Sequence, residues 1–421
     1  MNKLTIPGIL LVILVHLGAC TDIEPTLTDP VEKTRSEEMN LNRTLEEALQ
    51  YADEWFSQME GGTRAGAREI KSVDFITTGP ATRSSQSDTL MYLVNYANEG
   101  GFALLGRNKV GRDIYAISDE GRLSMQDTIY NEGLADFMAL AIADASMPNV
   151  SIPIDTTQLV NPWIYSITRR LDPMLNENVA KWNQSAPFNQ YCPIINGKQG
   201  VVGCGPVAVG MLMAYYKWPK KIDGVTIPWS SIVDKNDYSS IARFLEDIAG
   251  SNYLAAYYVT NNGQLSPDAR ATSTSNIIPT YNKLSYNTSC ALASKAFYSV
   301  MNDTFDFMKN GYQSAEPAPI LMYGYGTNVY TNKSAGHIWV VDGFVERVRK
   351  RKFSASWATP EEADPLLHMV WGWGGTANGY YTYFRDERQL SQKTSDEKSD
   401  CQRKYGSLSV YGRFYKIYTQ E

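Results

Sequence analysis

The sequence contains few of the residues that supply bases, nucleophiles and metal ligands. Three histidines and five cysteines occur among 421 residues. The cysteines form no Cys-x-x-Cys pair and no cluster with histidine, so the ligand spacing typical of a zinc site is missing. We therefore expect neither a metal nor another cofactor.

An excess of positive charge is also missing. Lysine and arginine together number 39 against 45 aspartates and glutamates, which gives a net charge of -6 at pH 7. Nucleic-acid-binding domains usually present a basic surface, so we expect no nucleic-acid partner. The basic run at residues 347–352 is local and is predicted to be a solvated loop or strand edge.

The apolar run near the N-terminus is short. It covers residues 6–17 behind a positively charged start and ends in Leu-Gly-Ala-Cys at 17–20. This pattern indicates an export signal rather than a membrane span, and its ending resembles a bacterial lipobox in which Cys20 carries the lipid. We predict a lipoprotein signal peptide at 1–20, a flexible tether at 21–38, and a chain exported and lipid-anchored to a bacterial membrane, on its periplasmic or cell-surface face. A plain signal peptide is the alternative.

One cysteine lies in a sequence suited to a nucleophile. Gly-Cys-Gly-Pro at residues 203–206 precedes an apolar stretch that ends at Tyr216, which predicts a turn feeding a buried helix with proline in its first turn. The free N–H groups and the dipole at a helix N-terminus favour a thiolate. Cys204 is therefore a candidate nucleophile, although an inert buried cysteine has the same local pattern.

The choice of a base for this thiol is narrow. His16 lies in the predicted signal peptide, which leaves His337 and His368. His337 begins a β-branched run that ends in Asp-Gly and is predicted at the mouth of a short strand. His368 lies inside an apolar run and is predicted to be a hydrogen-bonded core histidine. Because a thiol nucleophile needs a general base, we predict that His337 serves Cys204.

The remaining cysteines are widely and irregularly spaced. Cys192, Cys290 and Cys401 lie far apart in a chain long enough for a large core. Export would permit disulfides, but this spacing does not predict a disulfide scaffold. Whether any two of them pair is left open.

The length predicts two domains, and the first has no catalytic constellation. We assign residues 39–160 to it and expect a binding or regulatory module. Its expected elements are a helix at 40–59 with an N-cap at 42–44, strands at 72–76, 89–96, 102–106 and 113–117, a turn at 100–101, and a helix at 131–145.

The second domain, residues 161–421, carries the candidate site. Gln184 lies in a polar, turn-prone stretch, where it is either a turn residue or an amide donor to an oxyanion. The other expected elements are helices at 162–182, 204–216 and 240–249, strands at 319–326 and 412–418, and an aromatic and glycine run at 370–381. The predicted fold class is α+β, with a helix carrying Cys204 against an antiparallel sheet carrying His337, preceded by a smaller α+β domain.

Four stretches in this order resemble the streptopain family of papain-like cysteine peptidases. They are Trp-Asn-Gln-Ser-Ala-Pro-Phe-Asn at 182–189, Gly-Cys with its apolar helix at 203–219, Gly-His-Ile-Trp-Val-Val-Asp-Gly at 336–343, and Trp-Gly-Trp-Gly-Gly with Asn-Gly-Tyr-Tyr at 371–381. Residues 92–121 similarly look like the family's propeptide, which packs on the catalytic domain and holds the zymogen inactive.

The resemblance implies a role for each matching residue. Cys204 would be the nucleophile, His337 the general base and later acid, and Gln184 the oxyanion donor alongside the Cys204 main-chain N–H. Trp371 matches the tryptophan beside the catalytic histidine. Two positions depart from the family. Gly205-Pro206 replaces the commoner Val-Ala after the nucleophile, and Val370 stands where an asparagine usually orients the imidazole, although a valine side chain forms no hydrogen bond. Another group or a main-chain carbonyl would have to orient His337.

These observations together predict a secreted, lipid-anchored cysteine endopeptidase made as a zymogen. Its substrates would be proteins or peptides, and its own propeptide domain would be an intramolecular inhibitor. Val370 motivates a second interpretation, a catalytically weak or inactive relative that binds protein at the cell surface. A third is another thiol acyl-transfer enzyme on the same scaffold, such as a peptidoglycan amidase or a transglutaminase.

Overall fold

The computed structural model describes most of the chain after residue 40. The described residues are 41–60, 68–77, 89–109, 111–129, 131–146, 164–327, 334–350, 362–382 and 411–419. The predicted signal peptide and tether lie outside them. The predicted domain boundary between 160 and 161 also falls outside and stays a prediction.

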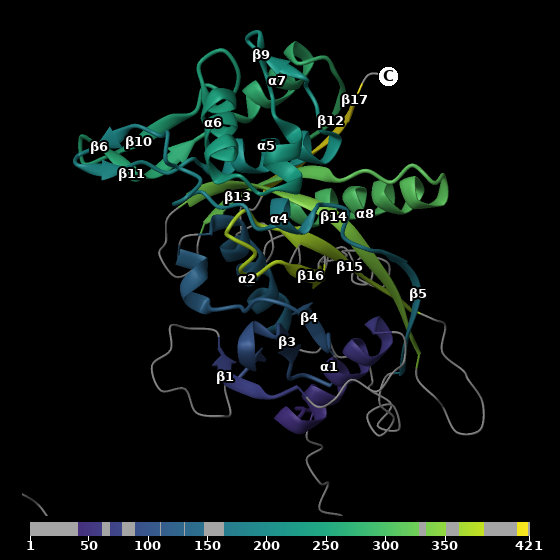
Figure 1. Ribbon diagram of the computed structural model, residues 1–421. Helices are drawn as coiled ribbons and strands as arrows, with labels where there is room; N and C mark the ends of the chain where they lie inside the picture. The colour runs from purple at the N-terminus through teal and green to yellow at the C-terminus, as the bar shows by residue number, and fades with distance from the viewer. Residues whose placement is uncertain are drawn as a thin grey trace, which may run out of the picture. The chain divides into compact units, whose positions relative to one another are not determined.

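A large antiparallel sheet runs through both halves of the chain (Figure 1). Its strands follow the order β1-β2-β3-β4-β16-β15-β14-β13-β17-β12, and β5 also pairs with β14. Their bounds are β1 (Ile70–Ile76), β2 (Met91–Tyr96), β3 (Phe102–Gly106), β4 (Ile114–Ser118), β5 (Ile164–Leu171), β12 (Tyr286–Ala296), β13 (Ile320–Thr327), β14 (Ser334–Lys350), β15 (Glu362–Val370), β16 (Gly379–Thr382) and β17 (Tyr411–Thr419). The pairing of β4 with β16 joins the N-terminal strands to the C-terminal ones.

Two helices enclose the N-terminal strands. They are α1 (Leu45–Met59), which Thr44 caps through a capping box with Glu47, and α2 (Glu132–Ala145), which Asn131 caps. Strands β2, β3 and β4 are buried along their whole length, because alternate side chains point to α1 on one face and to α2 on the other. The predicted helices and strands of this part are confirmed within a few residues.

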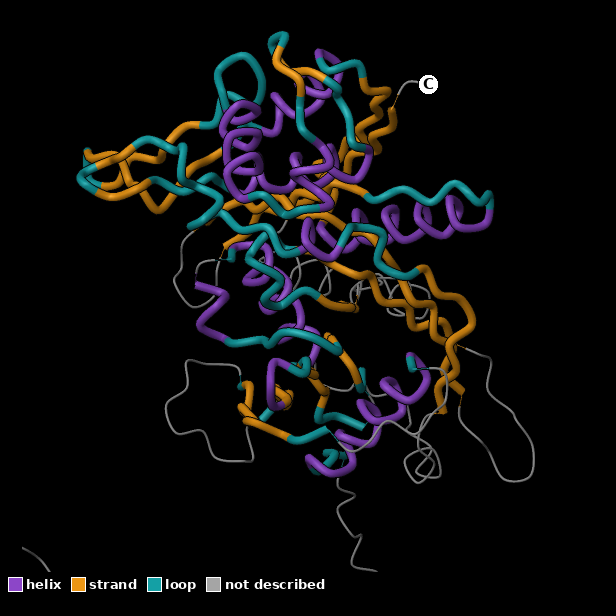
Figure 2. The backbone as a smooth tube through the Cα atoms, in the orientation of Figure 1, coloured by secondary structure: helices purple, strands orange, loops and turns teal. Residues whose placement is uncertain are grey.

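A second group of helices surrounds the apolar helix α5 (Cys204–Tyr216). It comprises α4 (Glu177–Ala180), α6 (Tyr238–Ala249) and α7 (Ile277–Lys283). Helix α8 (Phe297–Gln313) instead contributes Phe305 and Met308 to the apolar cluster that contains α2. Short hairpins extend from this part, β6 (Ile194–Ile195) with β7 (Lys198–Gln199), β8 (Lys221–Ile222) with β9 (Val225–Thr226), and β10 (Tyr257–Asn261) with β11 (Gln264–Ala271) (Figure 2). No helix among the described residues is both long and apolar enough to span a membrane.

Strands β13 and β14 lie between α5 and α2. Leu321, Ile338 and Val340 belong to the apolar cluster around α5. The neighbouring residues Trp339 and Val341 belong to the cluster around α2. The α+β prediction, with the Cys204 helix against the antiparallel sheet that carries His337, is confirmed, as is the antiparallel pairing of the two strands.

The helix predicted over 162–182 is wrong. Residues Ile164–Leu171 form strand β5, which pairs with β14, and only Glu177–Ala180 is helical in the described part of this stretch. The alternation of Ile, Tyr, Ile and Thr near its start suits a strand, and the far part of β14 supplies the hydrogen-bonding partner. That partner lies about 180 residues further along the chain and is invisible to local periodicity.

The solvated basic run predicted at 347–352 is wrong for its first member. Arg347 is 3% exposed, because the strand that begins near His337 continues to Lys350 between β5 and β15. Its guanidinium is paired with Asp364 and lies 3.9 Å from the Asp113 carboxylate. The run is therefore partly interior, and the strand is much longer than the short one predicted.

Candidate active site

The candidate nucleophile begins the buried helix α5. Its N-cap, Gly203, has φ of 92°, and a Cβ at that position would lie 2.7 Å from the Arg270 carbonyl oxygen, so the turn requires glycine. The main-chain N–H groups of Ile338, of Gly205 and of Cys204 itself face the sulfur and lower the pKa of the thiol, against the effect of burial. Because Ile338 follows His337, the thiol lies against the main chain next to the candidate base.

The imidazole of His337 is fully buried. Its Nε2 lies 2.9 Å from the carbonyl oxygen of Trp371. Its ring is stacked on Trp339 with centroids 6.1 Å apart and is tilted against Trp371 at 6.5 Å. When Nε2 carries the proton and donates to this carbonyl, Nδ1 is the nitrogen free to accept a proton.

This carbonyl takes the place of the side chain that Val370 lacks. Val370 is fully buried among the apolar residues around α5, and the next residue presents its main-chain oxygen to the ring. The sequence required some other group or a main-chain carbonyl to orient His337. The structure identifies that group as the carbonyl of Trp371.

Gln184 lies beside the loop that leads into α5. Its carbonyl accepts from the N–H of Val202 at 2.8 Å, two residues before Cys204. Its own N–H donates to Asn183 Oδ1 at 2.6 Å, and the residue is 8% exposed. The main chain thus places the predicted oxyanion donor close to the nucleophile loop.

The first turn of α2 also reaches this site. Glu132 Oε2 lies 3.8 Å from His337 Nδ1. A Cβ on Gly133 would lie 2.9 Å from both His337 Cδ2 and Trp371 Cζ3. Sequence reasoning missed this pair, because a Glu-Gly dipeptide at a helix start has no catalytic spacing and only the resemblance to a propeptide pointed to the region.

No hydrogen bond connects the Cys204 thiol with the His337 imidazole in this structure. Nδ1 of His337 has no hydrogen-bond partner among the described residues, the Cys204 thiol included. Burial and then the Glu132 carboxylate raise the pKa of Cys204 to about 12, and burial lowers the pKa of His337 to about 4. The thiolate predicted from the helix N-terminus is therefore absent in this arrangement, because burial outweighs the N–H groups that stabilise it. The cysteine and the histidine lie near each other, but the thiol keeps its proton in this arrangement.

The other histidine has a structural place. His368 Nδ1 lies 2.6 Å from Asp342 Oδ1, and the second oxygen of that carboxylate accepts the Leu175 N–H at 3.0 Å. The prediction of a hydrogen-bonded core histidine is confirmed.

Cys192 and Cys204 are free cysteines. Cys192 is buried beside Glu246 and Arg270, and burial with the nearby Glu246 raises its pKa to about 12. Cys401 lies outside the described residues, and the side chain of Cys290 is not among those described.

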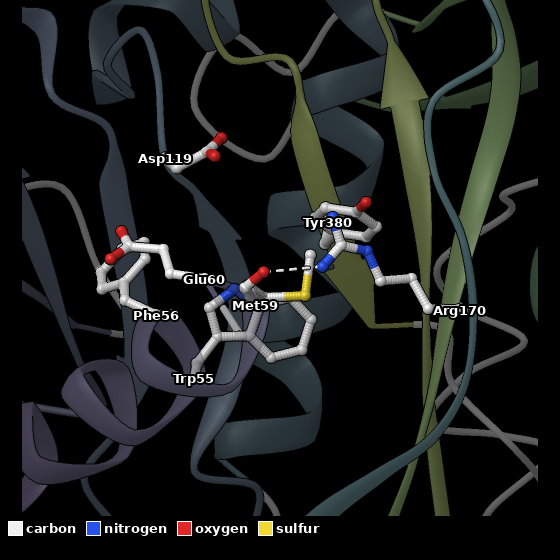
Figure 3. A pocket seen from close by; sticks show the side chains of 7 residues that line it. All are labelled: Trp55, Phe56, Met59, Glu60, Asp119, Arg170 and Tyr380. Carbon is white, nitrogen blue, oxygen red and sulfur yellow. Dashed lines mark hydrogen bonds between the residues drawn. The ribbon is translucent and has the colours of Figure 1, made fainter. Parts of the chain in front are cut away.

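A pocket elsewhere in the molecule contains none of the predicted site residues (Figure 3). It lies where the end of α1 meets β5 and β16, and Arg170 donates across it to the Met59 carbonyl at 2.7 Å. Its lining residues are Trp55, Phe56, Met59, Glu60, Asp119, Arg170 and Tyr380. The first turn of α2, with Glu132 and Gly133, instead lies against His337.

Comparisons with known proteins give matches to both parts of the chain. Residues 182–381 match the Peptidase C10 family, and residues 29–142 match the Spi protease inhibitor family. The chain is 21% identical over 380 residues to the thiol protease/hemagglutinin PrtT of Porphyromonas gingivalis. That match covers 80% of this chain and 38% of the relative, so the chain spans well under half of that protein.

Solved structures of Prevotella intermedia interpain A are also similar. A fragment of prointerpain A matches with a TM-score of 0.48 at 15% identity, covering 83% of this chain and 100% of that one. Active interpain A matches with a TM-score of 0.37 at 14% identity, covering 59% of this chain and 95% of that one.

Proposed function

We propose that the chain is an endopeptidase made as a zymogen, because residues 182–381 match the Peptidase C10 family and residues 29–142 match the Spi protease inhibitor family. One observation carries the proposal. The main-chain N–H that follows His337 faces the Cys204 sulfur and lowers the pKa of the thiol, against the effect of burial, and the carbonyl oxygen of Trp371 lies 2.9 Å from Nε2 of that imidazole.

The chemistry is a thiol acyl transfer in two halves. In the active form, Nδ1 of His337 takes the proton from Cys204, and the thiolate forms a bond to the carbonyl carbon of the substrate. The Gln184 amide and the Cys204 N–H stabilise the oxyanion. The imidazolium then gives its proton to the leaving amine, and a water molecule deprotonated by His337 hydrolyses the thioester to release the acid and the free thiol.

The N-terminal domain inhibits this chemistry through α2. Glu132 brings a negative charge close to the thiol and Gly133 packs on the imidazole. The domain is also held by the pairing of β4 with β16 and by the bond from the Ala377 N–H to the Arg122 carbonyl, 3.0 Å long. Its departure removes the carboxylate, admits water, and leaves the imidazole free to turn toward the thiol.

The test of the proposal is replacement of the nucleophile. Cys204→Ala abolishes self-processing and casein hydrolysis, whereas Cys192→Ala, the matched control at the other described free cysteine, retains both. A thiol-reactive epoxide labels the processed wild-type enzyme at Cys204 and not at Cys192. Casein hydrolysis by the Cys204→Ala protein at the wild-type rate would overturn the assignment.

The same experiment separates the two other functions. Val370 motivates an inactive relative that only binds protein, and such a protein shows no selective labelling at Cys204. An amidase or transglutaminase yields amide or cross-linked products in place of new amino termini.

We further propose that the protein is exported and lipid-anchored through Cys20. The support is the Leu-Gly-Ala-Cys sequence at 17–20 behind a short apolar run. Cys20→Ser would remove the acylation site, so the variant no longer incorporates labelled palmitate and leaves the detergent phase. Unchanged incorporation would exclude an anchor at this residue.

A further inference from the structure

We propose that Asn378 is a positioning residue, which holds Trp371 so that its carbonyl meets the His337 imidazole. This role rests on the proposed peptidase function. Asn378 is 3% exposed. Its Oδ1 accepts the N–H of Trp371 at 3.1 Å, and its Nδ2 donates to the carbonyl of Ala180 at 3.0 Å.

This bridge needs an amide side chain. One end must accept from a main-chain N–H and the other must donate to a main-chain carbonyl, and among short side chains asparagine alone offers both in a fixed fork. The partners lie on different elements, since Ala180 ends α4 and Trp371 follows β15. Asn378 thereby ties the residue that orients His337 to the helical part of the peptidase.

The loop between the two bonded residues explains why such a tie is required. Residues 372–377 turn tightly, with φ of 77° at Gly372, 71° at Gly374 and 83° at Gly375. Glycines that readily adopt this conformation also leave it readily. The loop therefore depends on fixed ends, and Asn378 closes it by bonding back to Trp371.

The tie lies wholly within the peptidase part. Ala180, Trp371 and Asn378 all follow the predicted domain boundary. By contrast, the bond from the Ala377 N–H to Arg122 joins this loop to the inhibitor domain. Removal of the inhibitor domain breaks the bond between Ala377 and Arg122 but leaves both bonds of Asn378. The position of this loop in the processed enzyme therefore depends more strongly on Asn378.

The consequence for catalysis passes through the imidazole. The Trp371 carbonyl keeps the proton on Nε2 and opposes the effect of burial on the ring. If Trp371 shifts, the hydrogen bond between its carbonyl oxygen and His337 Nε2 lengthens. The ring proton is then no longer confined to Nε2, and Nδ1 is no longer always available to accept the thiol proton. We expect kcat to fall while KM changes little, because the Asn378 side chain is buried and bonded at both ends to main-chain groups of the protein.

Two substitutions and one control separate positioning from folding. Asn378→Ala removes both bonds and should lower kcat about tenfold or more with KM within about twofold. Asn378→Asp keeps an acceptor for the Trp371 N–H but turns a carboxylate oxygen toward the Ala180 carbonyl, so it should recover only part of that loss. Asn95→Ala removes a similar buried bridge, in which the amide exchanges two 2.9 Å bonds with Leu123 in the inhibitor domain, and should leave kcat of the processed enzyme unchanged.

A spectroscopic measurement makes the outcome independent of turnover. Because the chain has three histidines, 15N-histidine spectra of the Cys204→Ala zymogen can be assigned with a His368→Gln variant. We expect His337 in the Nε2–H tautomer, and a mixture of tautomers in Asn378→Ala. An unchanged tautomer and pH profile in Asn378→Ala would overturn the inference. A wild-type protein without peptidase activity would instead refute the proposed function, and the spectrum would still decide the role of Asn378.

Discussion

The carboxylate of Glu132 adds to the effect of burial, the larger cause, in raising the pKa of the Cys204 thiol. Its own pKa is raised by burial. The N–H groups around the sulfur act in the opposite direction but are too weak to produce a thiolate.

Glu132→Gln should therefore make the thiol of the uncut zymogen more reactive. Removal of the negative charge lowers the pKa of Cys204, so the pH dependence of iodoacetamide alkylation moves to lower pH. Glu99→Gln, at an exposed glutamate of the same domain, is the control and should leave the curve in place. The explanation fails if both variants alkylate like the wild type.

Asp136 is a second carboxyl group of α2 whose surroundings disfavour its charged form. It is 2% exposed, its Oδ2 has no hydrogen-bond partner among the described residues, and burial with the nearby Glu132 raises its pKa to about 8. The folded chain thus holds a proton that the unfolded chain releases near pH 4. Stability contributed by this group is present at low pH and is lost as pH rises toward 8.

Asp136→Asn should remove this pH dependence. In the Cys204→Ala background, the free energy of unfolding of Asp136→Asn relative to its parent should rise by up to about 1.4 kcal/mol per pH unit between pH 5 and 7. The lowered pKa of His337 acts with the opposite sign, but it is common to both proteins and cancels. Parallel stability curves from denaturant titrations would contradict the assignment.

Among the elements, the long strand β14 contacts two different parts of the molecule. Its first part carries His337 and pairs with β13, and its last part extends between β5 and β15 toward α1. There the Arg347 guanidinium lies over the rings of Trp55 and Tyr165. The strand that carries His337, the proposed base, therefore also contacts the N-terminal domain.

Arg347→Met should weaken the fold of the zymogen strongly. The substitution keeps much of the side-chain volume but leaves Asp364 and Asp113 with less compensating charge in a buried site, which costs about 3 to 5 kcal/mol. Lys198→Met, which removes an exposed pair with Asp268, should cost about 1 kcal/mol or less. Equal denaturation midpoints for the two variants would refute a buried ionic contact at β14.

What the sequence could predict depends on how local the cause is. The helix that begins at Cys204 and the pairing of the strands around His337 follow from apolar runs and their glycine boundaries. Strand β5, the burial of Arg347 and the approach of Glu132 depend on partners distant along the chain. Val370 indicated that a substitute orienting group was needed, but no local pattern could name the Trp371 carbonyl.

At the scale of the whole molecule, inhibitor and peptidase share one sheet. Strand β4 pairs with β16 through Ala116 and Ile117. The apolar clusters on both faces combine side chains from the two parts, with Phe137 beside Tyr381 in one and Trp55 beside Tyr380 in the other. Cutting the connecting chain breaks none of these contacts.

We therefore expect a nicked zymogen to stay together. With a site-specific protease sequence inserted between residues 147 and 163 of the Cys204→Ala protein, the two cut fragments should co-elute from a sizing column at neutral pH, as the uncut chain does. They should separate only in denaturant. Separate elution in native buffer would show that the shared sheet does not hold the inhibitor in place.

Departure of the inhibitor would change the status of strand β16. Now interior, it would become the border of the remaining sheet, with the main-chain groups that faced β4 turned to water. Gly379–Thr382 is only four residues long, and so brief a border gives a foreign strand little to align with. The mature enzyme would therefore lose the inhibitor domain without gaining a sheet edge long enough to promote aggregation with its own copies.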